Sequence, residues 1–169
     1  MQIRPAATRD AEAICAIYNW EVEATAATFD LIPRSLADQL AWLEDHAGAY
    51  PALVAVAEAG EDFPAGQVLG FASLSPYRDR PGYATTVENS VYVDRAARGR
   101  GIAKALLRAL IDQAAAQGFH SIIARITGEN GTSVTLHESV GFTLVGIERE
   151  VGRKHGRWLD VIELQLLLD

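Results

Sequence analysis

The residues best suited to chemistry in this 169-residue chain lie in one glycine-bearing run, Arg98-Gly99-Arg100-Gly101-Ile102-Ala103-Lys104. The run follows an apolar segment, Val91-Tyr92-Val93, and leads into a long amphipathic stretch. The first amides of a helix are free and carry partial positive charge, and glycine lets an anion approach the backbone closely. The run therefore predicts a site for phosphate groups between a strand and a helix.

The spacing of the glycines excludes two common nucleotide motifs. A dinucleotide fingerprint would place a third glycine where Lys104 stands. A P-loop would end in Gly-Lys-Ser or Gly-Lys-Thr, and this ending does not occur. A glycine turn with only a structural role remains an alternative at this point, because such turns are common between strands and helices.

Local charge favours an anionic ligand over that alternative. Residues 95–108 contain five basic residues and no acidic one, within a chain of formal net charge -7. A solvated helix face would have acids interspersed with its bases. We therefore expect one compact polyanion to be held here by charge and backbone together. The overall negative charge argues against nucleic acid as a partner.

The elements that must position this run follow from periodicity and turn signals. A strand is expected around Ile3, and helices are expected to begin at Thr8 and Ser35. Later strands are expected at 52–58, 68–74, 85–94, 121–126 and 142–151 and from Trp158, and later helices at 101–117 and 133–140. This order predicts an α/β (α+β) fold, with a mixed sheet flanked by helices in a single domain over residues 1–169.

Composition sets the class of protein. Hydrophobic residues make up 49% and charged residues 22%, which is typical of a soluble globular domain. Cys15 is the one cysteine, so a stapled secreted scaffold is excluded and a reducing cytoplasm is expected. The chain shows neither a signal-peptide pattern nor an apolar run long enough to span a membrane. Since the histidines lack ligand spacing, we expect no metal.

Two motifs resemble the GCN5-related N-acetyltransferase (GNAT) superfamily. Arg98-x-x-Gly101-x-Ala103 after the Val-Tyr-Val strand resembles the Q/R-x-x-G-x-G/A motif, whose amides hold the pyrophosphate of acetyl-CoA. Asn130-x-x-Ser133-x-x-Leu136-His137 resembles the family's next helix, whose asparagine contacts the cofactor. The resemblance covers essentially the whole chain. It implies a mostly antiparallel central sheet and acetyl-CoA as co-substrate, with contacts at Val91, Tyr92, Val93, residues 98–104 and Asn130.

A narrower resemblance concerns four runs, 77–83 (YRDRPGY), 86–93 (TVENSVYV), 136–138 (LHE) and 152–161 (GRKHGRWLDV). They are similar to the phosphinothricin and methionine sulfoximine acetyltransferase group. The resemblance implies acetylation, on the amine, of a small α-amino acid or analogue with an acidic or oxidised side-chain group, such as methionine sulfone. It also implies a homodimer. The substrate contacts that it implies are Arg78, Arg80, Tyr83, Glu88 and Thr127.

Three residues are candidates for proton transfer. Glu88 stands in an apolar strand, where a carboxylate is costly unless it is hydrogen-bonded or functional. In the similar enzymes the matching glutamate is the general base, acting directly or through water; the alternative is a structural ion pair with Arg78 or Arg80. His137 stands where many GNAT enzymes have a tyrosine that protonates the leaving thiolate, and it could instead be a packing residue. Tyr92 is a second candidate donor or a core aromatic residue.

Three further side chains and two other functions belong to these expectations. Phe29 could cover the substrate, although a core position is the simpler interpretation. We expect Trp158 to pack and Asp160 to satisfy backbone donors. The alternative functions are acetylation of another amine, such as a peptide N-terminus or a polyamine, and a non-catalytic acyl-CoA-binding module.

Overall fold

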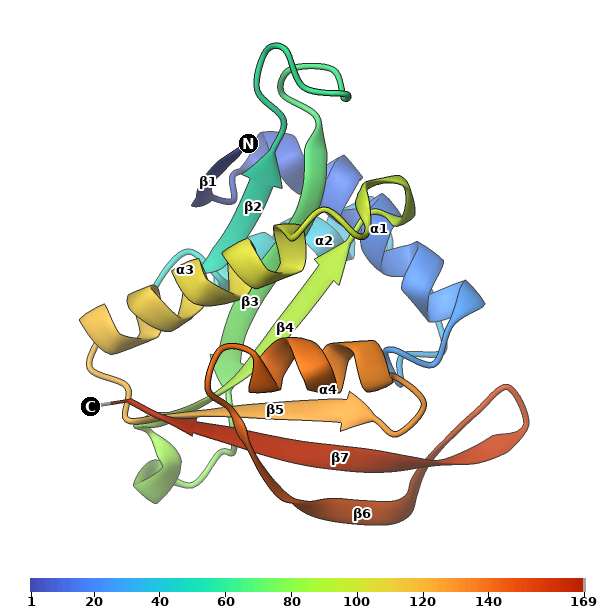
Figure 1. Ribbon diagram of the computed structural model, residues 1–169, viewed down its shortest axis with the longest axis vertical. Coiled ribbons are helices and arrows are strands. Elements are labelled where there is room, and N and C mark those ends of the chain that lie inside the picture. Colours follow the sequence, from blue (N-terminus) through green and yellow to red (C-terminus); the bar gives the residue numbers. More distant parts are fainter. Residues whose placement is uncertain (169) are drawn as a thin grey trace.

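The computed structural model describes residues 1–168 and arranges them around one seven-stranded sheet (Figure 1). The strand order is β1-β2-β3-β4-β5-β7-β6, and every pair of neighbours is antiparallel except β4 and β5. The expected mixed, mostly antiparallel sheet is therefore confirmed. The strands are β1 (Gln2–Pro5), β2 (Ala52–Val56), β3 (Val68–Pro76), β4 (Thr86–Val93), β5 (Ser121–Thr127), β6 (Thr143–Lys154) and β7 (Arg157–Leu167).

Helices cover both faces of the sheet, and the expected order of helices and strands is confirmed. The α-helices are α1 (Ala11–Ala24), α2 (Leu36–Asp45), α3 (Ile102–Ala116) and α4 (Gly131–Glu138). Ser35 opens α2 with a reciprocal capping box, in which its hydroxyl accepts from the Asp38 amide at 3.1 Å. Thr8 does not cap α1 directly, because a 3-10 turn over Thr8–Asp10 comes first.

Two hydrophobic clusters follow from the alternation of side chains along the strands. In β2, Leu53 and Ala55 pack in the cluster under α3, whereas Val54 and Val56 pack in the cluster under α1. Figure 1 shows α3 and the helices α1 and α2 on opposite sides of the sheet. The sheet is thus buried on both faces near its centre, and this rigid part of the molecule carries β4.

Strand β4 keeps an unbroken register with β3, from Val87 opposite Pro76 to Val93 opposite Gly70. Side chains therefore alternate along β4, with Val87 packing under α3 and Tyr92 packing with the residues under α1. On its other side, β4 pairs with β5 only over Thr86–Glu88 and Ser121–Ile123. Beyond Glu88 the two strands diverge (Figure 1), which leaves an opening in the middle of the sheet.

A bulge interrupts β6 near the tip of the β6–β7 hairpin. Glu148 pairs with Val161 and Gly152 with Leu159, so residues 149–151 lie opposite Asp160 alone. The Asp160 carboxylate accepts the Glu150 amide at 2.8 Å and Arg149 Nη1 at 2.6 Å, which fits its expected structural role.

Trp158 does not pack as expected. Its residue is 61% exposed, and the guanidinium carbon of Arg153 lies 5.4 Å from the ring centroid. The indole therefore contributes surface rather than core. None of the helices within residues 1–168 is long and apolar enough to cross a membrane.

An ion pair fastens β1 to the start of α1. Arg4 donates to both carboxylate oxygens of Asp10 at 2.7 and 2.8 Å, and the Ala7 amide donates to the same carboxylate at 2.9 Å. Burial alone would raise the pKa of Asp10, but these donors outweigh it and the pKa is lowered. The charged form of Asp10 is thus the form that stabilises the fold.

We expect Asp10→Asn to lower the free energy of unfolding by about 3 kcal/mol at pH 7, because it leaves Arg4 without its anionic partner. The stabilisation by the pair is present above the unfolded-state pKa of Asp10. It is lost as pH falls through the lower folded-state pKa. The difference in the free energy of unfolding between the wild type and Asp10→Asn should therefore shrink in acid. Urea unfolding measured from neutral to acidic pH checks this. Asp112→Asn, at an exposed acid on α3, is the control, and an equal effect of both variants would contradict the prediction.

Candidate active site

Two connected cavities occupy the opening between β4 and β5. The larger one, the outer cleft, has a volume of about 670 Å³ and extends to the start of α3. The smaller one, the inner cavity, has a volume of about 290 Å³ and lies deeper along the two strands. Both are lined by Val91, Tyr92, Thr127, Asn130 and Ser133. A molecule bound in the outer cleft can therefore reach a second molecule in the inner cavity.

Nearly all of the predicted cofactor contacts line the outer cleft. Arg100 is the exception, because it points away and donates to Asp62 at 2.5 Å. The predicted contacts that line the outer cleft are Val91, Tyr92, Val93, Arg98, Gly99, Gly101, Ile102, Ala103, Lys104 and Asn130. Asn130 also caps α4, since its Oδ1 accepts the Ser133 amide at 3.2 Å.

The start of α3 presents free amides to the outer cleft. Gly99 and Gly101 both have φ of 77°, and a side chain at either position would meet no atom within 4 Å. The glycines are therefore required by the left-handed backbone rather than by packing. The Ala105 amide makes the first bond of the helix, to the Gly101 carbonyl at 3.1 Å. The amides of residues 102–104 precede it and point out of the helix end.

Two of the basic residues in the run are neutralised by acidic residues from other parts of the chain. Glu21 in α1, which is 5% exposed, accepts a hydrogen bond from Arg98. Asp62 of the β2–β3 loop accepts one from Arg100. The expectation that five bases stand without acids is therefore wrong for these two residues. The reason is that their partners come from distant parts of the chain. At the cleft, anion binding would depend on the helix amides and Lys104.

Glu88 lines the inner cavity, and its carboxylate has a mixed electrostatic environment. Burial raises the pKa of Glu88; Arg125 opposes this, whereas Glu163 and Glu148 add to it. The structure shows no ion pair between Glu88 and Arg78 or Arg80 among the described residues. The cation near Glu88 is Arg125, which itself forms an ion pair with Glu148. Glu88 is thus a half-buried acid poised to bind a proton more readily than an ordinary glutamate.

His137 also lines the inner cavity, but both of its ring nitrogens have partners. Its Nδ1 lies 2.7 Å from the Ser133 carbonyl oxygen, and a carbonyl can only accept, so Nδ1 carries the proton. Its Nε2 accepts from Asn89 Nδ2 at 2.9 Å. Burial lowers the pKa of His137, which is 2% exposed. A neutral imidazole without a proton on Nε2 has none to give there, so this geometry favours the packing role.

Asn89 is a residue of the site that the sequence motifs left without a role. Its Oδ1 is buried and finds no hydrogen-bond partner among the described residues, and the residue lines the inner cavity. A buried acceptor of this kind is costly unless something donates to it. The signal was available, since Asn89 is a polar residue in the same apolar strand that drew attention to Glu88.

Tyr92 packs as a core aromatic residue and also lines the candidate site. Its ring packs in a cluster, with its centroid 5.2 Å from that of Tyr18 and 5.3 Å from that of Phe71. Burial raises the pKa of the Tyr92 hydroxyl, so this group keeps its proton at neutral pH. Tyr92 also lines both cavities, where a protonated hydroxyl can donate a hydrogen bond.

The predicted substrate contacts divide into two groups. Thr127 lines both cavities. Arg78, Arg80 and Tyr83 line neither; they are exposed in the β3–β4 loop, where Arg78 lies over the rings of Tyr77 and Tyr83. Phe29 lines the inner cavity and is 37% exposed, so the simpler interpretation of a core residue is wrong.

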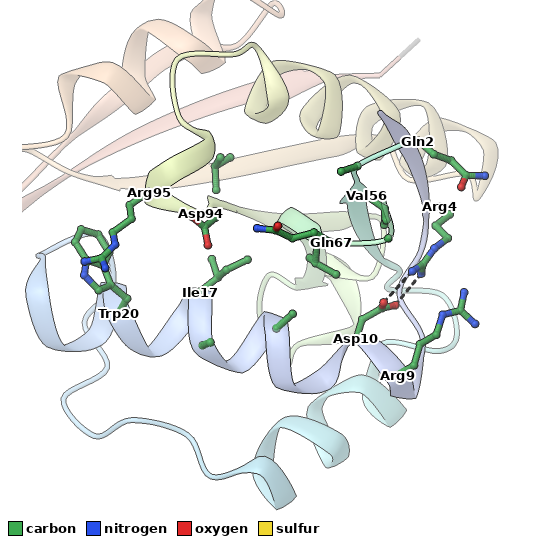
Figure 2. A pocket seen from close by; sticks show the side chains of 16 residues that line it. Gln2, Arg4, Arg9, Asp10, Ile17, Trp20, Val56, Gln67, Asp94 and Arg95 are labelled. Atoms are coloured by element: carbon green, nitrogen blue, oxygen red, sulfur yellow. Dashed lines mark hydrogen bonds and ion pairs between the residues drawn. The ribbon is translucent and has the colours of Figure 1, made fainter. Parts of the chain in front are cut away.

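A third cavity lies apart from this chemistry. It has a volume of about 860 Å³, between α1 and the end of the β2–β3 hairpin. Figure 2 shows the paired Arg4 and Asp10 at one end and Arg95 beside Trp20 at the other. None of the proton-transfer candidates lines it, and its floor is made by almost fully buried residues such as Val56 and Val68. The outer cleft and inner cavity are therefore the candidate active site.

Comparison with known proteins agrees with this geometry. The family model of the acetyltransferase (GNAT) domain matches residues 3–162. The chain is 44% identical, over 99% of its length and 94% of the relative's, to an L-methionine sulfoximine/L-methionine sulfone acetyltransferase of Pseudomonas aeruginosa. It is 41% identical to a phosphinothricin N-acetyltransferase of Streptomyces coelicolor, over 95% of this chain and 92% of that one.

A solved structure extends the similarity to three dimensions. It is a GNAT superfamily phosphinothricin acetyltransferase from Sinorhizobium meliloti in complex with acetyl-CoA. Its TM-score to this chain is 0.92 at 38% identity, covering 99% of this chain and 88% of that one. With the family model, the relatives and the divergent strands in agreement, the chain belongs to the GNAT acetyltransferase family.

Proposed function

We propose that this protein transfers the acetyl group of acetyl-CoA to the α-amine of a small amino acid analogue of the phosphinothricin, methionine sulfoximine or methionine sulfone type. The observation that carries the proposal is the position of Glu88. Its carboxylate lines a cavity of about 290 Å³ that opens into a cleft ending at free helix amides. An acceptor amine and an acyl donor can thus meet beside a proton acceptor.

The outer cleft has the chemistry to hold acetyl-CoA, which supplies the thioester acetyl group. The amides of residues 102–104 and the Lys104 side chain fit a pyrophosphate, and the open space at Gly99 and Gly101 lets it approach the backbone. Past Glu88, β4 has no paired strand on its β5 side, so the edge of Val91–Val93 can hydrogen-bond an extended ligand. The phosphinothricin acetyltransferase from Sinorhizobium meliloti, whose structure is similar to this chain, is in complex with acetyl-CoA, which supports this assignment.

Glu88 would take the proton that the acceptor amine must lose before it attacks. An amino acid amine is mostly protonated at neutral pH, and only the free base is a nucleophile. The raised pKa of Glu88 makes its carboxylate a stronger base while Arg125 still favours the charged form. We assign donation to the departing sulfur to Tyr92, whose hydroxyl keeps its proton and which lines the outer cleft. His137 keeps Asn89 in place.

The inner cavity suits a small acceptor. Its volume lies at the low end of small-molecule sites, which favours a single amino acid over a peptide or a polyamine. Arg78, Arg80 and Tyr83 remain proposed contacts of the acidic or oxidised side-chain group. Because they do not line the cavity, such contact requires the β3–β4 loop to reach it from its own chain or from a second copy.

We expect Glu88→Gln to lower kcat at least about 100-fold at neutral pH, because the amide cannot accept the proton. The affinity for acetyl-CoA should stay unchanged, since the outer cleft does not include Glu88. Thiol release with methionine sulfone, methionine sulfoximine, phosphinothricin, a peptide and a polyamine measures the activity, and calorimetry measures binding. An unchanged kcat would remove Glu88 from the role of base. Binding of acetyl-CoA without thiol release on any amine would favour the non-catalytic module.

The pH profile should respond to Arg125. Arg125 lowers the pKa of Glu88, so Arg125→Gln should raise it further and move the acidic limb of kcat/KM to higher pH. Activity would then be lost at a pH where the wild-type enzyme still works. Arg9→Gln, at an exposed arginine outside the site, should leave the limb in place. A limb that moves to lower pH in Arg125→Gln would contradict the assignment.

We also propose a cytoplasmic homodimer. The location rests on the single, free Cys15, and the dimer on the family resemblance and on β6. This strand ends the sheet and exposes four apolar side chains, Leu144, Val145, Ile147 and Val151. Such an edge strand tends to pair with another chain, and a second copy offers the same surface in return. Light scattering should give twice the mass of one chain, and Val145→Asp should give the monomer; a wild-type monomer would overturn the dimer.

A further inference from the structure

The wall of the inner cavity includes a segment outside the regular elements, residues 25–30, which connects α1 toward α2. Thr25, Ala26 and Ala27 line the outer cleft, and Ala27, Thr28 and Phe29 line the inner cavity. One short segment thus faces both substrates of the proposed reaction. Phe29 is its large side chain, and it is the residue of the segment that can limit the size of the acceptor.

The tip of the β6–β7 hairpin holds this segment in place. Lys154 donates from Nζ to the Thr28 carbonyl at 2.7 Å, and His155 Nε2 lies 3.2 Å from the Thr25 carbonyl. Lys154 is only 3% exposed, and burial lowers its pKa. From the other side, the Tyr18 hydroxyl hydrogen-bonds Thr28 and Asp30 at 2.9 and 2.6 Å. The segment that carries Phe29 is therefore held from two sides, by the hairpin tip and by Tyr18, which itself lines the inner cavity.

Gly152 provides the surface on which the Phe29 ring rests. A Cβ atom at Gly152 would lie 2.3 to 2.7 Å from three atoms of that ring, which is far inside van der Waals contact. The φ angle of Gly152 is not positive, so the backbone itself does not require glycine there. Gly146 on the same strand differs in one respect, since a Cβ there would meet nothing within 4 Å. The missing side chain at Gly152 is what lets the ring lie where it does.

We propose that Phe29 and Gly152 together determine which acceptor side chains the inner cavity admits; this rests on the proposed function and specifies its substrate. Phe29 lines the cavity and Gly152 does not, so the ring separates the two. The backing at Gly152 is backbone, which cannot yield as a side chain could. A longer acceptor side chain therefore meets a ring that cannot retreat toward β6. Acceptors of the size of methionine sulfone fit, and longer S-alkyl homologues are disfavoured.

The experiment compares S-methyl, S-ethyl and S-propyl homocysteine sulfones, which differ by one methylene per step and keep the same charge. In the wild type, kcat/KM should fall by about tenfold or more per added methylene. Gly152→Ala should push the ring into the cavity and steepen this fall, whereas Phe29→Ala should flatten it. Gly146→Ala is the matched control and should keep the wild-type ratio.

The double variant tests whether Gly152 acts through the ring. If it does, Phe29→Ala combined with Gly152→Ala should have the ratio of Phe29→Ala alone. The proposal would be overturned if Gly152→Ala changed the fall in kcat/KM per methylene equally with and without Phe29→Ala. It would also be overturned if Phe29→Ala alone kept the wild-type fall. The second of these outcomes decides even where Gly152→Ala fails to fold.

Failure of the proposed function would look different. If the wild-type enzyme acetylates none of the three sulfones, the proposed function is wrong. The contact between Phe29 and Gly152 is then tested by the position of the Phe29 ring. Crystal structures of Gly152→Ala and Gly146→Ala show the position of this ring and do not depend on activity. The Phe29 ring should move in Gly152→Ala and stay in place in Gly146→Ala, and a ring that stays in place in both would overturn the proposal.

Discussion

The short pairing between β4 and β5 is the constraint on which the site depends. Three residue pairs, Thr86–Glu88 with Ser121–Ile123, hold the strands together at one end, and the divergence beyond them creates both cavities. Glu88 is the last residue of β4 that pairs with β5, so it lies at the deep end of the opening. A ladder continued by four residues would close the space and bury the backbone edge that an extended ligand needs. The regular pairing of β4 with β3 keeps the remaining edge rigid.

A second feature of the molecule is the use of acids to position bases. The chain carries seven more acidic than basic residues, and two of the bases beside the cleft are already paired. Glu21 accepts from both Arg98 and Thr25, and so it links the loop before α3 to the segment after α1. Both of these segments line the outer cleft. The pairing thus fixes the walls of the cleft and leaves the helix amides as the principal donors to an anion.

Much of the fold could be predicted from the sequence because it depends on neighbours in the chain. The Ser35 capping box, the left-handed glycines before α3 and the alternation along β4 are local, and each is present. The remaining features depend on contacts across the fold. Glu21 and Arg98 are 77 residues apart, and Asn89 and His137 are 48 apart, so no spacing rule pairs them. The neutral state of His137 and the contact between Phe29 and Gly152 likewise exist only once distant segments meet.

The bulge in β6 has a consequence for how such a chain can diverge in evolution. Residues 149–151 lie opposite Asp160 alone, and Gly152 follows them directly. Because side chains alternate between faces, an insertion or deletion of one residue that shifted the pairs beyond the bulge by one position would turn position 152 to the other face, while the pairs up to Glu148 stay in register. A residue other than Gly152 would then lie against the Phe29 ring. A change of length at an exposed edge strand can therefore reshape the acceptor cavity without replacing any residue that lines it.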